Sequence, residues 1–186
     1  MRVMSLFIVL VLLLGGCAYY SAVDSRYVVH RAYSVTPDRT WNRVSSGSEE
    51  RWTLNGIGLD SLVLYAGIED QKPLIKLDGD NPPIFRSELR ATEVAELYVA
   101  TLTRTGAGRA EYMNLRPSPF GTLPGFRFEF RFFNENGLEF KGLAQGAITP
   151  EGNLHFMTFS APATHYYAAS LPHVEVLFDS VRLVSG

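Results

Sequence analysis

The sequence is poor in the residues on which most enzyme chemistry depends. It contains one cysteine, Cys17, so the chain cannot form an internal disulfide. None of its four histidines lies in a His-Glu-x-x-His motif or another close ligand pair. They are His30, His155, His165 and His173. We therefore predict no metal site and no cofactor, and we interpret the histidines as surface or hydrogen-bonded side chains.

Motifs for nucleophilic catalysis and for calcium binding are missing as well. There is no Gly-x-Ser-x-Gly motif, which places a nucleophilic serine on a sharp turn in many hydrolases. Ser160 and Ser170 flank His165 in the sequence, so a hydrolase with dispersed catalytic residues stays an alternative. The segment 78–81, Asp-Gly-Asp-Asn, lacks the twelve-residue spacing and the final glutamate of a calcium loop, so we interpret it as a solvated turn. We predict no catalytic residue.

The chain also has no excess of positive charge. Its 17 Lys and Arg residues face 19 Asp and Glu residues, which gives a formal net charge of −2. Proteins that bind nucleic acid carry basic patches against the phosphates, and strong attraction to anionic lipid needs clusters of Lys and Arg. This balance argues against both kinds of partner.

A membrane-spanning run is missing, but a shorter apolar run follows the N-terminus. Residues 4–14, MSLFIVLVLLL, come after the positive charge of Arg2. A bilayer-spanning helix needs about 20 apolar residues, whereas a run of 7–15 behind a basic end has the size of a signal-peptide core. The sequence Leu14-Gly15-Gly16-Cys17 follows directly. It resembles the lipobox of bacterial lipoprotein precursors, which reads Leu, small, small, Cys.

The lipobox resemblance implies where the protein is anchored. In that family the signal is cut between the positions of Gly16 and Cys17, and the Cys17 sulfur receives a diacylglycerol. Two or three acyl chains make a lasting membrane anchor, whereas one binds reversibly. We expect a signal peptide over residues 1–16, a lipidated tether over 17–27 and a single α+β domain over 28–186. Ala18 lacks the Asp that marks inner-membrane retention in enteric lipoproteins, which implies an outer-membrane protein facing the periplasm.

The first half of the domain predicts strands followed by one helix. Alternation of apolar and polar residues over 27–35 predicts a single strand. Asn55-Gly56 predicts a tight hairpin turn, and the run 62–66, LVLYA, predicts a central strand covered on both faces. Residues 92–105 carry apolar side chains at helical spacing, with Thr92 as the expected N-cap and Gly106 as the expected stop.

The second half predicts a long aromatic hairpin. A three-residue loop at 135–137, with Gly137 in a left-handed conformation, would set the pairs Phe132–Phe140, Phe130–Gly142, Phe128–Ala144 and Phe126–Gly146. Phenylalanine rings would then cover small residues, which stabilises glycine in strands. Arg131 would oppose Lys141 on the outer face, where a glutamate at 129 or 139 would screen the repulsion. Residues 110–117 and 154–160 predict further strands, and 181–184 predict a short edge strand. Val174, Leu177, Phe178 and Val181 have helical spacing and predict a helix, which Pro172 either starts or kinks as part of a longer helix.

This order of elements predicts an α+β fold, an antiparallel sheet packed with helices as an α/β/α sandwich. The layout over residues 28–186 resembles that of the photosystem extrinsic-protein (PsbP-like) group, which includes small bacterial lipoproteins. The segment WTLNGIGLDSLVLYAGI, residues 52–68, is also similar to one in proteobacterial lipoproteins. Neither resemblance implies a functional residue.

From these features we predict a non-enzymatic binding or assembly module held in the cell envelope by its lipid anchor. Its expected partners are the membrane, through Cys17, and an envelope protein or a hydrophobic ligand, but not nucleic acid. The alternatives are the envelope hydrolase and a carrier of a small hydrophobic ligand. The phenylalanine ladder is expected to be core, although a groove for an apolar ligand or peptide stays open.

Overall fold

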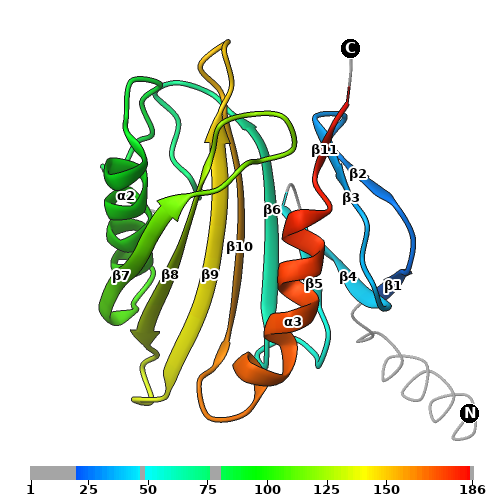
Figure 1. Ribbon diagram of the computed structural model, residues 1–186. Helices are drawn as coiled ribbons and strands as arrows, with labels where there is room; N and C mark the ends of the chain where they lie inside the picture. Colours follow the sequence, from blue (N-terminus) through cyan, green and yellow to red (C-terminus); the bar gives the residue numbers. More distant parts are fainter. Residues whose placement is uncertain (1–19, 47–48, 76–80, 185–186) are drawn as a thin grey trace, which may run out of the picture.

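Strands from both halves of the chain assemble into one large antiparallel sheet. The computed structural model describes residues 20–46, 49–75 and 81–184 (Figure 1). The eight strands lie in the order β1-β4-β5-β6-β10-β9-β8-β7. Their bounds are β1 Tyr20–Val23, β4 Trp41–Ser46, β5 Glu49–Thr53, β6 Ser61–Ile68, β7 Gly108–Pro117, β8 Phe126–Phe133, β9 Glu139–Ile148 and β10 Leu154–Pro162.

Two helices and a small second sheet cover this large sheet. The small sheet has the order β11-β3-β2, with bounds β2 Tyr27–Val29, β3 Tyr33–Val35 and β11 Arg182–Leu183. Helix α2 (Ala91–Arg104) lies over β7 and β8, and α3 (Tyr166–Asp179) lies over β10 and β9 on the other side (Figure 1). Neither helix in the described part of the chain is long and apolar enough to cross a membrane.

Side chains of the sheet form two separate cores, one on each face. On the face of α3 and the small sheet, which we call the front face, Trp41, Trp52 and Phe159 pack with Phe178 of α3. On the back face, the phenylalanine ladder packs under α2. Leu62, Val63 and Leu64 of β6 are all buried. Both faces of the sheet are therefore covered at this central strand, as predicted.

The aromatic hairpin has the predicted register. Phe132 pairs with Phe140, Phe130 with Gly142, Phe128 with Ala144 and Phe126 with Gly146. Gly137 has φ +75°, and the Asn134 N–H donates to the Leu138 carbonyl at 3.0 Å, so residues 135–137 form the predicted three-residue loop. Phe126, Phe128 and Phe130 are buried, so most of the ladder is core as expected.

The N-terminal part of the domain differs from the prediction. Residues 20–23, assigned to the tether, form β1 and pair with β4, and Tyr27 begins β2. The strand predicted over 27–35 is instead a hairpin, since His30 and Arg31 adopt φ +44° and +61° and reverse the chain. Neither turn residue is glycine, and the alternation of apolar and polar side chains continues through the turn. The sequence pattern therefore did not reveal the turn. Cys17 and Gly16 lie outside the described residues.

The turn predicted at Asn55-Gly56 is a longer loop, residues 54–60, built on a buried carboxylate. Asp60 accepts hydrogen bonds from the Leu54 N–H at 2.9 Å, from Asn55 Nδ2 at 2.5 Å and from the Thr53 hydroxyl. Gly56 is left-handed, as predicted, at φ +115°. A carboxylate with this many donors holds the loop in one conformation.

Both helices were predicted, with errors at their starts. The N-cap of helix α2 is Arg90, two residues before the expected Thr92, and its N–H donates to Glu93 Oε2 at 2.8 Å. Gly106, with φ +93°, ends it as predicted. Helix α3 is the longer of the two forms considered, since Pro172 lies inside it.

Candidate functional site

The front face of the sheet is exposed at the end of β8 and β9 next to their hairpin loop, and over the neighbouring part of β7. Farther along the strands, Arg127 of β8 and Leu143 and Gln145 of β9 are buried on the same face. Helix α3 packs on β10 and β9 and reaches β8 through the ion pair of Asp179 with Arg127, while α2 covers the opposite face (Figure 1). Because strand side chains alternate, the residues on either side of Phe130 point to the front while its own ring packs on Tyr98 of α2. We call this region the open sheet face. Its side chains are Glu111 and Met113 of β7, Glu129 and Arg131 of β8, and Lys141 of β9.

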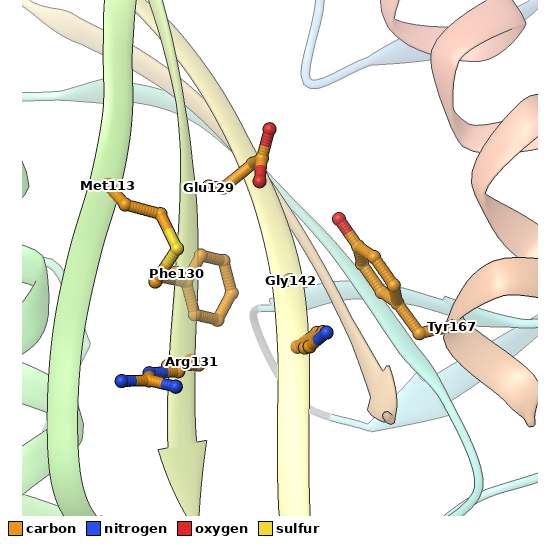
Figure 2. Close-up of a pocket in the computed structure, with 7 residues that line it drawn as sticks. Met113, Glu129, Phe130, Arg131, Gly142 and Tyr167 are labelled. Carbon is orange, nitrogen blue, oxygen red and sulfur yellow. The ribbon is translucent and has the colours of Figure 1, made fainter. Parts of the chain in front are cut away.

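The open sheet face contains a hollow of about 180 Å³ beside the start of α3. Tyr167 reaches from α3 toward the strands, and Glu129 and Arg131 lie at opposite ends of the hollow (Figure 2). Phe130 and Gly142 also line it. The ring of Phe130 leans on Gly142 on the back face, so these two residues present mainly main chain to the front.

Arg131 is the centre of the charged groups on this face. Its Nε is ion-paired with Glu111 Oε1 across β7 and β8, and its Nη1 lies 3.9 Å from Glu139 Oε1. Arg131 opposes Lys141 as predicted, and Glu139 provides the expected screening. Glu129 instead accepts a hydrogen bond from Asn114 Nδ2 at 3.1 Å. The face therefore presents charges of both signs in fixed places.

Tyr167 adds a neutral hydroxyl to the charged groups. Burial, helped by the negative charges of Glu129 and Glu175, raises the pKa of Tyr167 to about 12. The phenol is therefore protonated at neutral pH and can donate a hydrogen bond into the hollow. With Met113 and Arg131 beside it, the hollow combines an aromatic ring, a thioether and a guanidinium, which are groups enriched at protein interfaces.

The four histidines have separate structural positions. His30 lies in the β2–β3 turn, and His165 precedes α3 with its ring edge-to-face on Tyr166. His173 Nδ1 lies 2.7 Å from Asp38 Oδ2, which ties α3 to the segment before β4. Among residues 20–46, 49–75 and 81–184, no group of three or more His, Cys, Asp or Glu side chains is placed to hold a metal ion.

His155 is the buried histidine, and it is hydrogen-bonded as interpreted. It faces a bulge in β6, where Gly67 has φ +68° and donates its N–H to His155 Nδ1 at 3.0 Å. Nδ1 must be unprotonated to accept this bond, so the ring proton is on Nε2. Burial lowers the pKa of His155, which keeps the ring neutral. Its ring packs between Tyr33 and Phe120.

The serines weighed for a hydrolase lie on different faces of the molecule. Ser170 is buried in α3, where it accepts a hydrogen bond from Asn55 Nδ2 at 3.4 Å. Ser160 opposes Ser61 on β10 and β6. Within the described residues, no hydrogen bond joins either serine to His165. Most of the acidic segment 78–81 lies outside those residues, and only Asn81 is described, at φ +55°.

Sequence reasoning found part of this site. The predicted register placed Arg131 beside Lys141, but nothing indicated Met113 or Tyr167. Tyr167 is placed by the packing of α3 on the sheet, and no local sequence pattern predicts this packing. The position of Met113 depends on two register shifts in β7, where Arg109 and Asn114 have positive φ. A polar-apolar alternation in 108–117 was the available signal, and these shifts interrupt it.

Comparison with known proteins relates the chain to others through its fold. No family model and no curated sequence matches it. The Ran-binding protein Mog1p of Saccharomyces cerevisiae aligns at 11% identity over 91% of this chain and 97% of its own, with a TM-score of 0.53. A cyanobacterial PsbP protein of Synechocystis aligns at 15% identity over 91% and 95%, with a TM-score of 0.49. LpqN of Mycobacterium tuberculosis, described as involved in cell envelope biogenesis, aligns at 9% identity over 92% and 87%, with a TM-score of 0.39.

These likenesses concern fold. At 11% identity, the similarity to Mog1p shows a common α+β architecture and no more. The predicted class, an antiparallel sheet with helices packed on it, is confirmed. A PsbP protein, from the group whose layout the sequence resembles, is among the aligned structures, but TM-scores under 0.5 carry no argument.

Proposed function

We propose that the protein is a lipid-anchored module of the bacterial cell envelope that binds a segment of another envelope protein on its open sheet face. The observation that carries the proposal is the hollow between β8, β9 and α3 at the exposed end of the front sheet face. It brings together Tyr167, Met113 and Arg131, and tyrosine and arginine dominate the binding energy of many interfaces. Mog1p, which has the same fold, is described as a binding protein.

The arrangement of charge on this face favours a protein segment as its partner. Arg131 is already screened by Glu111 and Glu139, while Lys141 and Glu129 stand on either side of the hollow without an ion pair between them. A polypeptide with acidic and basic side chains can pair with both. Such complementarity sets partner choice and orientation more than affinity.

The anchor would hold the module close to the membrane. Cys17 lies three residues before Tyr20, where β1 begins. Three extended residues span about 10 Å. A module tied this closely would meet partners that are themselves in or beside the same membrane, which raises their effective concentration. By the lipobox resemblance and Ala18, we propose the outer membrane and its periplasmic side.

Replacing Cys17 by Ser should abolish lipidation, because formation of the thioether needs the sulfur. We expect palmitate label on the wild type and none on Cys17→Ser, with the variant unprocessed or released from the membrane. Metabolic labelling followed by membrane fractionation measures both. Equal label in the two proteins would refute the anchor, and wild-type protein found mainly in the inner membrane would refute the outer-membrane assignment.

A photocrosslinker in place of Met113 should capture the partner in living cells. We expect p-benzoylphenylalanine at Met113 to give one discrete adduct, since this side chain lines the hollow. The matched control is Val28, an exposed apolar residue of the small sheet, which should give none. Adding Arg131→Ala should reduce the Met113 adduct at least tenfold if Arg131 is an interface hot spot. An equal adduct at Val28, or one unchanged by Arg131→Ala, would contradict the proposed surface.

A further inference from the structure

The last rung of the phenylalanine ladder is only partly covered by α2, whose Leu102 lies near Phe132. Phe126, Phe128 and Phe130 are buried on the back face, whereas Phe132 and Phe140 are only half-buried. Their rings stack with centroids 5.2 Å apart and an interplanar angle of 14°. The cover is incomplete because α2 ends at Arg104 and the chain then returns as β7, where Gly108 lies opposite Phe133, the residue after Phe132. A pair of aromatic rings therefore remains open to other contacts at this end of the sheet.

This rung forms one wall of a second pocket, of about 300 Å³. Ile57, at the tip of the loop 54–60, supplies the facing apolar wall and is 57% exposed. The loop cannot easily collapse onto the rings, because the buried Asp60 carboxylate holds it through Leu54, Asn55 and Thr53. The apolar part of the pocket is therefore formed before any ligand arrives, which reduces the entropy lost on binding.

The other part of the pocket is polar and carries a cation. Arg51 of β5, Ser61 of β6 and Ser160 of β10 all point to the back face, since their strand neighbours Trp52, Leu62 and Phe159 lie in the front core. The hydroxyl of Ser61 is buried and has no hydrogen-bond partner among the described residues. Buried hydroxyls normally have one, so this oxygen is placed to bond an incoming group.

The carboxylate of Asp60 also borders the pocket, but its oxygens are taken up by the loop it supports. Arg51, Ser61 and Ser160 line the same part of the pocket and can meet a ligand's polar end. A guanidinium with hydroxyl donors matches a carboxylate. The stacked rings and Ile57 match a hydrocarbon chain, and 300 Å³ is near the lower limit for small-molecule pockets, which favours a short chain.

We propose that this pocket binds a medium-chain fatty acid, with the carboxylate at Arg51, Ser61 and Ser160 and the chain between Ile57 and the Phe132–Phe140 pair. The pocket is on the back face and the open sheet face is on the front, so this site does not depend on the protein-binding function. Each can fail without the other.

The test uses the intact protein in its own membrane and a decanoic acid that carries a diazirine on its chain. After irradiation we expect saturable label, mapped by mass spectrometry to residues 54–60 and 132–140. Unlabelled decanoate should compete, and each methylene added from hexanoate to decanoate should improve competition about three- to fourfold, as burial of a CH₂ predicts. Decanol, which lacks the charge, should compete at least tenfold less well than decanoate.

Two pairs of variants keep the test independent of folding. Ile57→Ser should reduce the label several-fold, whereas Val176→Ser, at another exposed aliphatic residue, in α3 (46% exposed), should not change it. Arg51→Met should remove the preference for decanoate over decanol, while Arg116→Met, at an exposed arginine of β7, should leave it intact. Label that does not saturate, equal competition by decanol, or unchanged label in Ile57→Ser would overturn the proposal.

Discussion

Gly142→Ala should lower the free energy of unfolding by about 3 kcal/mol, the upper end of the usual cost of overpacking a core. A Cβ at this position would lie 2.1 Å from Phe130 Cζ and 2.4 Å from the Phe159 carbonyl oxygen. Neither neighbour can move freely, since the Phe130 ring is held against Tyr98 and the carbonyl belongs to β10 in the middle of the sheet. Urea denaturation followed by the fluorescence of the buried Trp41 and Trp52 measures the change.

Gly108→Ala is the matched control. It is also a strand glycine of the aromatic half, but an added Cβ would lie 3.6 Å from the nearest atom, the Phe133 carbonyl oxygen, which is ordinary contact. We expect a change within about 0.5 kcal/mol, as for most surface substitutions. Equal midpoints and slopes for wild type and Gly142→Ala would mean that the Phe130–Gly142 pairing is wrong.

Glu50→Gln should have an effect of similar size, about 3 kcal/mol, for an electrostatic reason. Glu50 is 4% exposed and binds Arg43 Nε at 2.5 Å, Trp52 Nε1 at 2.7 Å and the Tyr27 hydroxyl at 3.0 Å. Removing one partner of a buried ion pair usually costs 3–5 kcal/mol, and the lower value applies here because the Arg43 side chain is 34% exposed. The control is Glu111→Gln, whose exposed pair with Arg131 should contribute less than about 1 kcal/mol.

The same carboxylate predicts how this difference varies with pH. Burial by itself would raise the pKa of Glu50, but hydrogen bonds from Arg43, Trp52 and Tyr27 outweigh it and hold the pKa below its ordinary value of 4.5. Since the folded state binds the proton less well than the unfolded state, the stability gained from Glu50 is full above pH 4.5 and is lost as the pH falls below it. The stability difference between wild type and Glu50→Gln should therefore shrink in acid, and a constant difference would show that Glu50 is not ionised in the folded protein.

Local sequence was sufficient where one pattern decided the structure. In β8 and β9, side-chain alternation and the left-handed Gly137 fix both strands and their register, so the ladder could be predicted rung by rung. The β2–β3 hairpin was missed because its turn residues, His30 and Arg31, have positive φ but neither is a glycine, the residue that usually indicates such a turn. Tyr20–Val23 was assigned to the tether because a four-residue edge strand is recognised only by its partner, β4.

The candidate sites were harder to predict than the fold, because they depend on contacts between segments that are distant in the sequence. Arg131 and Lys141 are neighbours through a predicted register, but Tyr167 and Ile57 come from elements whose positions depend on packing. Ile57 is placed by Asp60, whose carboxylate replaces the tight turn that Asn55-Gly56 indicated. Binding surfaces of this kind are assembled from separate elements, and the sequence carries no period or spacing that joins them.

The order of strands has a consequence for how the chain folds. Strands β4, β5 and β6 are joined by short connections, and so are β7, β8, β9 and β10, so each half of the sheet can form from nearby segments. The halves meet at β6 and β10, where Ser61 pairs with Ser160, almost a hundred residues later. Closing so long a loop loses chain entropy that no early contact offsets, and such pairings slow folding. We therefore expect the β6–β10 pairing to form late, and until it forms each half exposes one unpaired apolar strand edge.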